Sequence, residues 1–360
     1  IRYRIDGVLH EIMRLPKQVH PAITARIKLL SGLKLDDHTR PQDGRFRHKL
    51  GPDVVDIRVS IIPTMHGEKV EMRLLSAAQR PLSFEELGML EDTVKVIEDN
   101  IKKTFGMILV SGPTGSGKST TLYSILNTLN RPEVNVVTIE DPIEYNIKYV
   151  NQTQINPAAG ITFASALRSL LRQDPNIILV GEIRDNETAD IAVNAALTGH
   201  LLLSTVHTND AATVVPRLLD MKVPPFLVAA VMNVALAQRL VGKICPDCIE
   251  SYNPEARLLD LIQKQIEDMG IGNYKPMKIL YRGRGCKSCG NTGLKGRIGI
   301  YETIVFNEEI RSYISSPDFS LEGLKKIARK GGMISMYEDG LRKAERGMTT
   351  IEEVFRVIRE

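Results

Sequence analysis

Tryptophan is absent from the 360 residues, and all aromatic residues together make up 5%. Single-stranded nucleic acids are usually bound on stacked aromatic side chains, so this composition disfavours such a binder. With 47 basic and 43 acidic residues the net charge is +4, which is too small to indicate a nucleic-acid or membrane ligand by itself. The composition agrees with a soluble intracellular protein of two or three domains, each large enough to bury a core.

Long hydrophobic runs are also scarce. The longest uncharged apolar stretch, Val223–Gln238, contains two prolines and an asparagine, and it is shorter than the roughly 20 residues that span a bilayer. We therefore interpret it as a buried helix. No signal peptide is recognisable, because the chain opens at Ile1 in the alternating pattern IRYRID without an initiator Met; we expect a fragment that lacks N-terminal sequence.

Glycine, in contrast, is concentrated where an apolar strand pattern ends. Met107–Val110 is followed by a glycine-rich segment and then by a helical pattern, which is the context that a phosphate-binding loop requires. Backbone N–H groups and the helix N-terminus would form an anion site, Lys118 would reach the β- and γ-phosphates, and the Ser119 hydroxyl would bind Mg²⁺. A glycine-rich turn without a ligand is the alternative. The candidate nucleotide-binding residues are Gly112, Pro113, Thr114, Gly115, Ser116, Gly117, Lys118, Ser119 and Thr120.

Carboxylates follow two further buried-strand patterns. Val134–Ile139 leads into Glu140, and Asn176–Val180 leads into Glu182. Because parallel strands end at one rim of a sheet, both side chains are expected on the same rim as the glycine-rich loop, near Mg²⁺ or the attacking water. A turn or helix start is the alternative for the first segment, EDPIE. An ordinary surface acid is the alternative for Glu182.

Basic side chains accompany these strands. Arg168 and Arg172 share a helix face at i,i+4 spacing, where like charges repel each other unless an acidic or phosphate partner is near. Solvation of both arginines is the alternative. His207 ends the strand pattern Gly199–Asn209, which we expect in the same sheet as Glu182. A structural histidine is the alternative to a catalytic one.

The N-terminal residues 1–78 are typical of a small α/β domain, with a hairpin, a helix over Val19–Leu30 and two alternating strands. Proline and glycine mark a change of composition after it, so we place the domain boundary near residue 80 and a linker at 79–92. Arginines recur in this domain, either as a solvated surface or near an anionic ligand. They are Arg2, Arg4, Arg40, Arg45, Arg58 and Arg73.

The four cysteines form two Cys-x-x-Cys pairs, Cys245 with Cys248 and Cys286 with Cys289. Four thiolates in two such pairs indicate a tetrahedral Zn²⁺ without an open position, so the metal would be structural. The segment between the pairs is longer than in usual zinc ribbons, and we expect a helical insert at residues 253–268. Disulfides are the alternative, which an intracellular setting disfavours. After Glu302 we expect helices to the end of the chain.

Eight motifs in a fixed order make the chain resemble one family over essentially its whole length. They are RYRIDGVLHE, RPQDGRF, SGPTGSGKST, TIEDPIEY, ILVGEIRD, GHLLLSTVHTN, CPDC and GCKSCG. The chain is similar to the bacterial secretion ATPases that power type IV pilus assembly and type II secretion. The tetracysteine element favours pilus-extension and type II secretion motors over retraction motors. Between those two we favour pilus assembly, although no residue decides it.

The resemblance implies an α/β fold with four parts: a PAS-like domain at 1–78, a RecA-like P-loop ATPase core at 93–242, a tetracysteine zinc subdomain at 243–300 and a C-terminal helical region at 301–360. It implies ATP, Mg²⁺ and Zn²⁺ as ligands. It also implies a homohexamer in the cytoplasm, at the inner face of the inner membrane, with a membrane platform protein as partner. An acidic phospholipid surface is a further candidate partner, whereas nucleic acid is not expected.

The resemblance also assigns site residues. It places an acidic box at Glu140, Asp141 and Glu144, and either of the last two could help Ser119 to hold Mg²⁺. It places Walker B at Glu182 and a histidine box at His200 and His207, and it matches Arg58 and Arg73 to arginines that contact the phosphates. The expected reaction is hydrolysis of the ATP γ-phosphate, in which Glu182 orients or deprotonates water while Lys118 and the arginines stabilise charge.

Other protein classes fit less well. A GTPase switch is disfavoured because the chain contains neither an Asp-x-x-Gly nor an Asn-Lys-x-Asp sequence. A small-molecule kinase would need a lid and an acceptor pocket, for which no segment is evident. A nucleic-acid motor of the RecA class would share the core, and ATPase stimulation by DNA would favour it. A regulatory nucleotide-binding scaffold would not need both Lys118 and Glu182, and a turnover assay tests that alternative.

Overall fold

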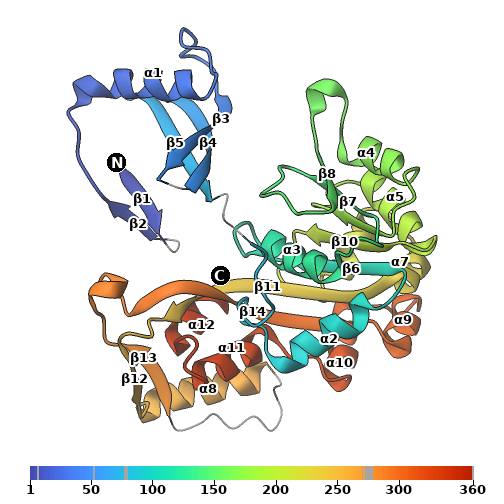
Figure 1. The fold of residues 1–360 in the computed structure, drawn as a ribbon. Coiled ribbons are helices and arrows are strands. Elements are labelled where there is room, and N and C mark those ends of the chain that lie inside the picture. Colours follow the sequence, from blue (N-terminus) through green and yellow to red (C-terminus); the bar gives the residue numbers. More distant parts are fainter. Residues whose placement is uncertain (6–7, 52, 77–79, 270, 272–278, 359–360) are drawn as a thin grey trace. The chain divides into compact units, whose positions relative to one another are not determined.

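The computed structural model describes residues 1–5, 8–51, 53–76, 80–269, 271 and 279–358. The chain forms two compact units (Figure 1). The first contains Ile1–Arg80 together with Glu144–Asn146, and the second contains Pro81–Ile143 and Ile147–Glu360. Each unit is α/β in composition, as the sequence predicted.

The first unit holds two small antiparallel sheets and one helix. Alternating apolar residues of the central strand face inward: Ile57, Val59 and Ile61 are buried and pack with Ile27 of the helix. Its elements are β1 (Arg2–Ile5), β2 (Val8–Glu11), a 3₁₀ turn (Lys17–Val19), α1 (His20–Leu30), β3 (Gln42–Leu50), β4 (Asp53–Thr64) and β5 (Gly67–Ser76). The predicted hairpin and helix are therefore confirmed, and the three-stranded sheet has the order β3-β4-β5.

A row of arginines crosses that three-stranded sheet. Arg58 of β4 lies directly opposite Arg45 of β3 and Arg73 of β5. Residues that are paired across neighbouring strands point to the same face, so the three guanidinium groups share one face, opposite to the one that buries Ile57 and Val59. Like charges in this arrangement repel each other and favour an anionic partner.

The second unit is built on a seven-stranded sheet with the order β14-β11-β6-β10-β9-β7-β8. All neighbouring strands run parallel except β14, which pairs antiparallel with β11 and closes one edge. The strands are β6 (Gly106–Ser111), β7 (Val136–Glu140), β8 (Val150–Gln154), β9 (Ile177–Val180), β10 (Leu201–Val206), β11 (Met232–Ile244) and β14 (Leu294–Val305). A mixed sheet of this kind leaves the carboxyl ends of β6, β7, β9 and β10 along one rim.

Apolar residues cover both faces of the sheet. In β6, Met107 and Leu109 join a large cluster with the helices on one face, whereas the alternating Ile108 and Val110 are equally buried on the other. The helices of this unit up to β11 are α2 (Glu91–Ile101), α3 (Lys118–Leu129), α4 (Phe163–Leu170), α5 (Asn186–Leu197), α6 (Val214–Asp220) and α7 (Pro225–Val231), with a 3₁₀ turn at Pro157–Ala159. Burial on both faces explains why these strands are almost continuously hydrophobic in sequence.

The expectation of one buried helix over residues 223–238 is wrong for its second half. Helix α7 ends at Val231, and β11 begins at Met232. Arg311 stabilises this ending, because its guanidinium donates to the carbonyl of Ala229, to that of Ala230 at 2.8 Å and to that of Met232 at 2.7 Å. A strand with a partner on each side and both faces covered has the same apolar composition as a buried helix, so composition could not separate the two.

The remaining elements surround the cysteine pairs and the C-terminal end. Helix α8 (Ala256–Asp268) is the expected helical insert, and it packs with α11 and α12 around Ile262, Tyr337 and Val354. The strand β14 runs through Gly296–Glu302 to Val305, and helices follow it, as expected. The bounds are β12 (Ile249–Tyr252), β13 (Leu280–Gly283), a 3₁₀ turn (Lys287–Cys289), α9 (Glu308–Ile314), α10 (Leu321–Lys330), α11 (Met336–Glu345) and α12 (Ile351–Ile358).

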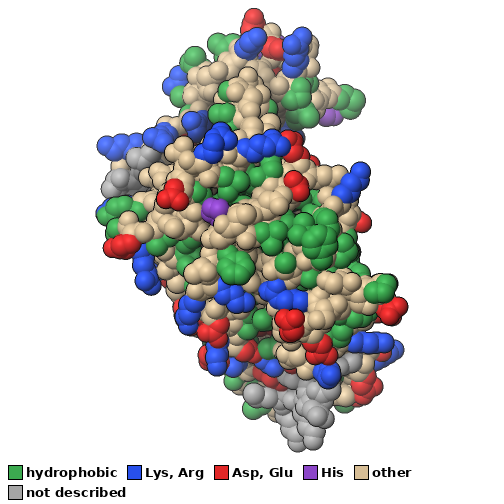
Figure 2. All heavy atoms as spheres, turned by 90° about the vertical axis from the view of Figure 1, so that its right-hand side faces the viewer, with side chains coloured by type: hydrophobic (Ala, Val, Ile, Leu, Met, Phe, Trp, Pro, Cys, Tyr) green, Lys and Arg blue, Asp and Glu red, His purple; other side chains and the backbone are tan. Residues whose placement is uncertain are grey.

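The surface mixes charges of both signs. Figure 2 shows Lys and Arg side chains interspersed with Asp and Glu side chains, with hydrophobic side chains gathered between them near the middle of the face. Among the described residues, none of the helices combines the length and the hydropathy that crossing a membrane requires.

Candidate functional site

The glycine-rich loop connects β6 to the N-terminus of α3. Gly117 is the N-cap of α3 with φ 89°, and Lys118 is the first residue of the helix. The loop passes close to β11: a Cβ on Gly117 would lie 2.7 Å from Nε2 of Gln238, and a Cβ on Gly112, whose φ is 144°, would lie 2.5 Å from the carbonyl oxygen of the same residue. Only glycine combines these φ angles with so close an approach. The loop is thus shaped as an anion cradle at a helix N-terminus.

Two side chains of the loop have unusual surroundings. Lys118 Nζ donates to the carbonyl oxygens of Gly112 at 2.8 Å and Pro113 at 3.0 Å. Ser116 is 4% exposed, and its hydroxyl has no hydrogen-bond partner among the described residues. A buried hydroxyl of this kind is costly unless a ligand satisfies it, so the loop fits an oxygen-rich ligand such as a phosphate.

Electrostatics link this loop to acidic and basic residues on neighbouring strands. Burial lowers the pKa of Lys118, the negative charge of Glu182 acts in the opposite direction, and the positive charge of Arg239 on β11 adds to the lowering. Glu182 and Arg239 therefore lie within electrostatic range of the Lys118 ammonium.

Glu182 is held just beyond the end of β9. The preceding Gly181 donates its N–H to the Ile139 carbonyl at 2.7 Å, and its own carbonyl accepts the Thr205 hydroxyl at 2.7 Å. These bonds attach the turn to β7 on one side and to β10 on the other. The Glu182 carboxylate is 8% exposed and sits at the rim that the sequence predicted.

Two basic side chains, Arg184 and His207, contact the Glu182 carboxylate. Arg184 Nη2 lies 2.5 Å from Oε1, and His207 Nε2 lies 3.2 Å from Oε2. Arg184 was not predicted as a site residue from the sequence, although it stands two residues after Glu182 in the motif ILVGEIRD. His207 follows β10, which pairs directly with β9, so the expected sheet neighbourhood of His207 and Glu182 is observed.

His200 lies elsewhere. It precedes β10, where its Nδ1 lies 2.8 Å from the carbonyl oxygen of Ala195, and the whole strand separates it from His207. A strand of this length spans about 20 Å, so His200 is at the opposite end of the sheet from Glu182. The structure brings only His207 of the two histidines to the candidate site.

The Glu140 carboxylate is enclosed by neutral donors. It is 4% exposed and accepts hydrogen bonds from the Tyr123 hydroxyl, from Thr138 Oγ1 at 2.5 Å and from Gln152 Nε2 at 3.1 Å. Tyr123 belongs to α3 and Gln152 to β8, so Glu140 joins the helix that follows the glycine-rich loop to two strands. Neither Tyr123 nor Gln152 was predicted from the sequence, because both contacts join residues that are distant along the chain.

The candidate Mg²⁺ ligands fall into two groups. Ser119, on the first turn of α3, and Asp141, directly after β7, are both exposed in the second unit. Glu144 belongs to the first unit, where its Oε2 lies 3.6 Å from Nη2 of Arg58.

The arginine pair of α4 has protein partners. Arg168 Nη2 lies 2.7 Å from Oε1 of Glu187 on α5, and Arg172 donates to the Arg168 carbonyl at 2.9 Å. Both interactions are on the exposed surface. Of the two interpretations of the arginine pair, the structure favours a solvated face with a local acidic partner.

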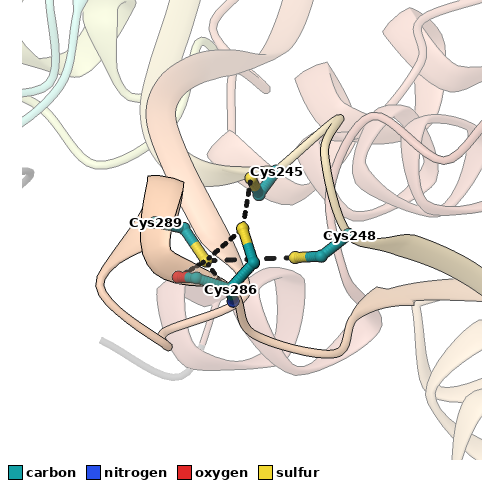
Figure 3. Close-up of side chains that lie close together, drawn as sticks. All are labelled: Cys245, Cys248, Cys286 and Cys289. Carbon is teal, nitrogen blue, oxygen red and sulfur yellow. Dashed lines mark hydrogen bonds between the residues drawn. The ribbon is translucent and has the colours of Figure 1, made fainter.

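The four cysteines converge in one cluster (Figure 3). Cys245 and Cys248 follow β11, Cys286 is the N-cap of the 3₁₀ turn before β14, and Cys289 is the last residue of that turn. The Sγ atoms of Cys245 and Cys286 lie 3.9 Å apart, and those of Cys248 and Cys289 are also 3.9 Å apart. The Sγ atoms of Cys286 and Cys289 lie 3.7 Å apart. These distances exceed the S–S bond of about 2.05 Å in a disulfide. They fit the separation of about 3.8 Å between thiolates bound tetrahedrally to zinc at about 2.3 Å.

Backbone donors favour a thiolate in this cluster. The N–H groups of Cys286 and Gly293 donate to Sγ of Cys289 at 3.2 Å and 3.3 Å. Burial alone would raise the pKa of Cys289, but these N–H groups and the thiols of Cys286 and Cys248 together lower the pKa to about 6. Burial raises the pKa of Cys245 and Cys248, so Cys289 is the thiol of the cluster that the protein itself favours as a thiolate. Metal ions bind the thiolate form, so the donor set suits a divalent cation.

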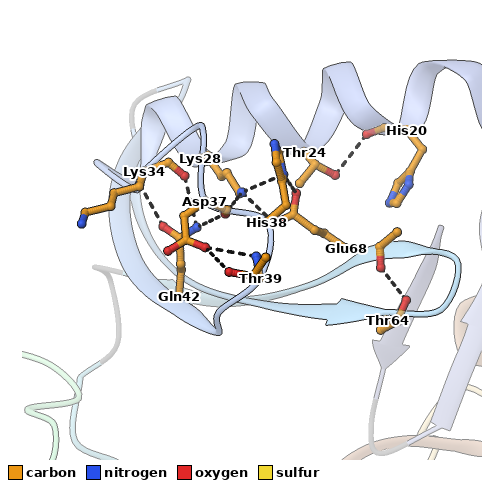
Figure 4. Close-up of polar contacts among 11 residues, drawn as sticks. His20, Thr24, Lys28, Lys34, Asp37, His38, Thr39, Gln42, Thr64 and Glu68 are labelled. Atoms are coloured by element: carbon orange, nitrogen blue, oxygen red, sulfur yellow. Dashed lines mark hydrogen bonds and ion pairs between the residues drawn. The ribbon is translucent and has the colours of Figure 1, made fainter.

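A second polar cluster lies in the first unit, between α1 and β5 (Figure 4). Lys28 is 1% exposed; its Nζ lies 2.6 Å from Oε1 of Glu68 and donates to the Asp37 carbonyl at 2.8 Å. His38 Nδ1 lies 2.9 Å from the other oxygen of Glu68. The lysine ammonium is thus neutralised and hydrogen-bonded by its own unit, which is what a buried charge requires. We interpret this cluster as structural.

Comparison with known proteins gives consistent results. The chain matches the family described as Type II/IV secretion system protein over residues 1–356. It is 46% identical, over 98% of its length, to the type IV pilus assembly ATPase PilB of Thermus thermophilus, and it covers 39% of that protein. It is 44% identical, over its whole length, to the type II secretion system protein E of Pseudomonas aeruginosa, and it covers 70% of that protein.

A solved structure shares the fold. The pilus retraction motor PilT, crystallised with bound ADP, is 26% identical and superposes with a TM-score of 0.64, covering 99% of this chain and 89% of the PilT chain. The match therefore extends through the glycine-rich loop, the central mixed sheet and most of the C-terminal helices. The chain belongs to the type II/IV secretion system protein family.

Proposed function

We propose that this chain is the ATP-hydrolysing part of a motor that drives type IV pilus assembly. One observation carries the proposal: the Lys118 loop at the end of β6 and the Glu182 carboxylate at the end of β9 share one rim of the sheet, within electrostatic range of each other. A phosphate cradle beside a carboxylate is the arrangement that nucleotide hydrolysis needs. The relatives named above support the proposal, since one is a type IV pilus assembly ATPase and the other a type II secretion system protein.

Residues of the second unit would bind and orient the nucleotide. The backbone N–H groups of the glycine-rich loop, except at Pro113, which has none, cradle the phosphates, and the Lys118 ammonium moves from the loop carbonyls to the phosphate oxygens. Ser119 is the proposed Mg²⁺ ligand, with Asp141 or Glu144 as further candidates; the ion would supply charge neutralisation at the phosphates when it is bound. Arg58 and Arg73 are proposed to contact the phosphates as well, consistent with their repulsive pairing across β4 and β5.

Glu182 is the proposed base. Its carboxylate contacts Arg184 and His207, which can release it when water and nucleotide enter, and it takes the proton of the attacking water or orients that water. Glu140 remains a candidate for the same step. Its three neutral donors support a different contribution, which is to hold α3 and the loop in place against β7 and β8.

The cysteine cluster is proposed to bind one structural Zn²⁺. Four sulfur ligands leave no position for water or substrate, so the ion would join the segment after β11 to the turn before β14 without entering the reaction. The proposed organisation is a PAS-like first unit and a RecA-like core in a cytoplasmic homohexamer. It would work at the inner membrane with a platform protein and, in addition, with acidic phospholipid; nucleic acid is not an expected partner.

The alternative function is a type II secretion ATPase, which the similar identity to the secretion relative favours equally well. The experiment is a deletion of the gene in its host, followed by measurement of surface pili and of secreted proteins. Loss of pili with intact secretion supports the assembly motor, and the converse supports the secretion motor. Both functions require ATP hydrolysis, which is tested by measuring ATP turnover by the purified intact protein. An inactive protein would contradict both.

A further inference from the structure

His207, which contacts Glu182, is the first residue of a loop without regular secondary structure. The loop spans His207–Thr213, between β10 and α6, and is called here the 207–213 loop. We propose that Glu302 and the Asp210–Lys325 ion pair are positioning residues that hold the 207–213 loop so that His207 contacts Glu182. The inference rests on the proposed function in so far as Glu182 is the base of ATP hydrolysis.

The ion pair joins the loop to α10. Lys325 Nζ lies 2.6 Å from Oδ2 of Asp210, while Oδ1 of the same carboxylate accepts the Thr213 N–H at 2.8 Å. Burial alone would raise the pKa of Asp210, but the hydrogen bonds from Lys325 and Thr213 outweigh it and leave the pKa below its ordinary value. Helix α10 is a firm support, because Leu324 and Ala328, which flank Lys325, are buried in the main core.

Glu302 joins the middle of the loop to the sheet. Its Oε1 accepts the Ala211 N–H at 2.9 Å, and both residues are buried. Glu302 belongs to β14, opposite Ala237 of β11, so its backbone is fixed by the ladder of the central sheet. A buried acid that satisfies a loop amide is costly to place, and its presence here indicates that the loop conformation is specified.

The other side of the loop reaches the candidate active site. His207 Nε2 lies 3.2 Å from Oε2 of Glu182, and Ser111, the residue before the glycine-rich loop, donates its hydroxyl to the Asp210 carbonyl at 3.4 Å. Asn209 Oδ1 accepts Nη2 of Arg239 at 3.4 Å. Asp210 and Ala211 are thus anchored from α10 and β14, while His207 and Asn209 face the residues that surround Lys118.

Anchoring matters because an unattached loop samples many conformations. Holding a side chain in one of them requires contacts to rigid elements, and a displacement of about 1 Å can cost about 100-fold in rate. The anchors of this loop, β14 and α10, are far from β9 in sequence. Residues of the C-terminal region would in this way set the geometry of a site built from the centre of the chain.

The test uses Lys325→Ala in the intact protein, because Lys325 is 43% exposed and its truncation should leave the fold intact. We expect kcat for ATP to fall about tenfold while KM changes less than about twofold. Lys325→Arg should restore most of the rate. In a His207→Ala background, Lys325→Ala should cause no further loss, because its effect passes through His207. Backbone amides of the 207–213 loop should exchange with solvent several-fold faster in Lys325→Ala.

Lys326→Ala is the matched control, since Lys326 is the exposed neighbour on the same helix and has no ion pair among the described residues. Lys326→Ala should have the same kcat and the same amide exchange in the 207–213 loop as the unaltered protein. Three results would each overturn the inference: the same kcat in Lys325→Ala and Lys326→Ala, additive losses with His207→Ala, or unchanged amide exchange in the loop. If the intact protein hydrolysed no ATP at all, the proposed function would fail, and the exchange measurement alone would still decide whether Lys325 holds the loop.

Discussion

Glu182 and Lys118 have separable surroundings, which allows binding and chemistry to be tested one residue at a time. Lys118 rests on the carbonyls of its own loop, where phosphates are expected. Glu182 follows a different strand, β9, and is held by Arg184 and His207. A change at Lys118 should therefore affect nucleotide binding, and a change at Glu182 should affect kcat.

We predict that Glu182→Gln lowers kcat by at least about 100-fold while ATP affinity stays similar or increases, because the amide keeps the size but removes the base and the negative charge. Lys118→Ala should instead weaken nucleotide binding. Steady-state kinetics combined with titration of a fluorescent ATP analogue separates the two effects.

Glu187→Gln, an exposed acid on the following helix, is the control and should retain the normal rate. Glu140→Gln tests the other carboxylate. If Glu182→Gln hydrolyses ATP at nearly the normal rate while Glu140→Gln is inactive, the base lies at Glu140, and the neutral donors around it must rearrange when nucleotide binds.

At the scale of secondary-structure elements, the cysteine cluster joins parts that the chain separates widely. The first pair follows β11, the second precedes β14, and these two strands pair antiparallel at the edge of the sheet. The helical insert α8 and the strands β12 and β13 lie between the pairs along the chain. A metal ion at the cluster would therefore close a long loop.

We predict one Zn²⁺ per chain, with an apparent contribution to the stability of its subdomain on the order of 10 kcal/mol. Cys286→Ser should release zinc and lower the melting temperature, while nucleotide affinity remains nearly unchanged because the cluster lies outside the glycine-rich loop. Elemental analysis and thermal unfolding measure the two effects. Ser288→Ala, in the same turn, should keep both the metal and the melting temperature; protein purified without chelators and found free of zinc would contradict the prediction.

At the scale of the whole molecule, the two compact units carry complementary chemistry. The second holds the glycine-rich loop, Glu182 and the cysteine cluster, and the first presents the arginine row of Arg45, Arg58 and Arg73 on one face of its sheet.

We predict that the double change of Arg58 and Arg73 to Ala cuts ATP turnover steeply with little loss of stability. Arginine contacts to transferred phosphates are worth about 10³- to 10⁵-fold in GTPases, which is an upper range for this case. Turnover and thermal unfolding of the intact protein provide the measurement, and Arg26→Ala on the exposed surface of α1 is the control. A normal rate in the double variant would mean that both arginines form a solvated surface.

The sequence by itself determined those features whose signal is local. The glycine spacing around Lys118, the apolar strand before Glu182 and the two Cys-x-x-Cys pairs each specify a backbone conformation or a ligand set within a few residues.

Only the tertiary structure decided the rest, because burial and long-range contacts have no local signal. Residues 223–238 became half helix and half strand, since β11 is paired on both sides and Arg311 of the distant helix α9 donates hydrogen bonds to the carbonyls at the end of α7. Glu140 and Glu182 look alike in sequence, yet one is surrounded by neutral donors and the other by Arg184 and His207. The positioning of His207 likewise depends on Glu302 and Lys325, which join the loop only when β14 and α10 pack against the sheet.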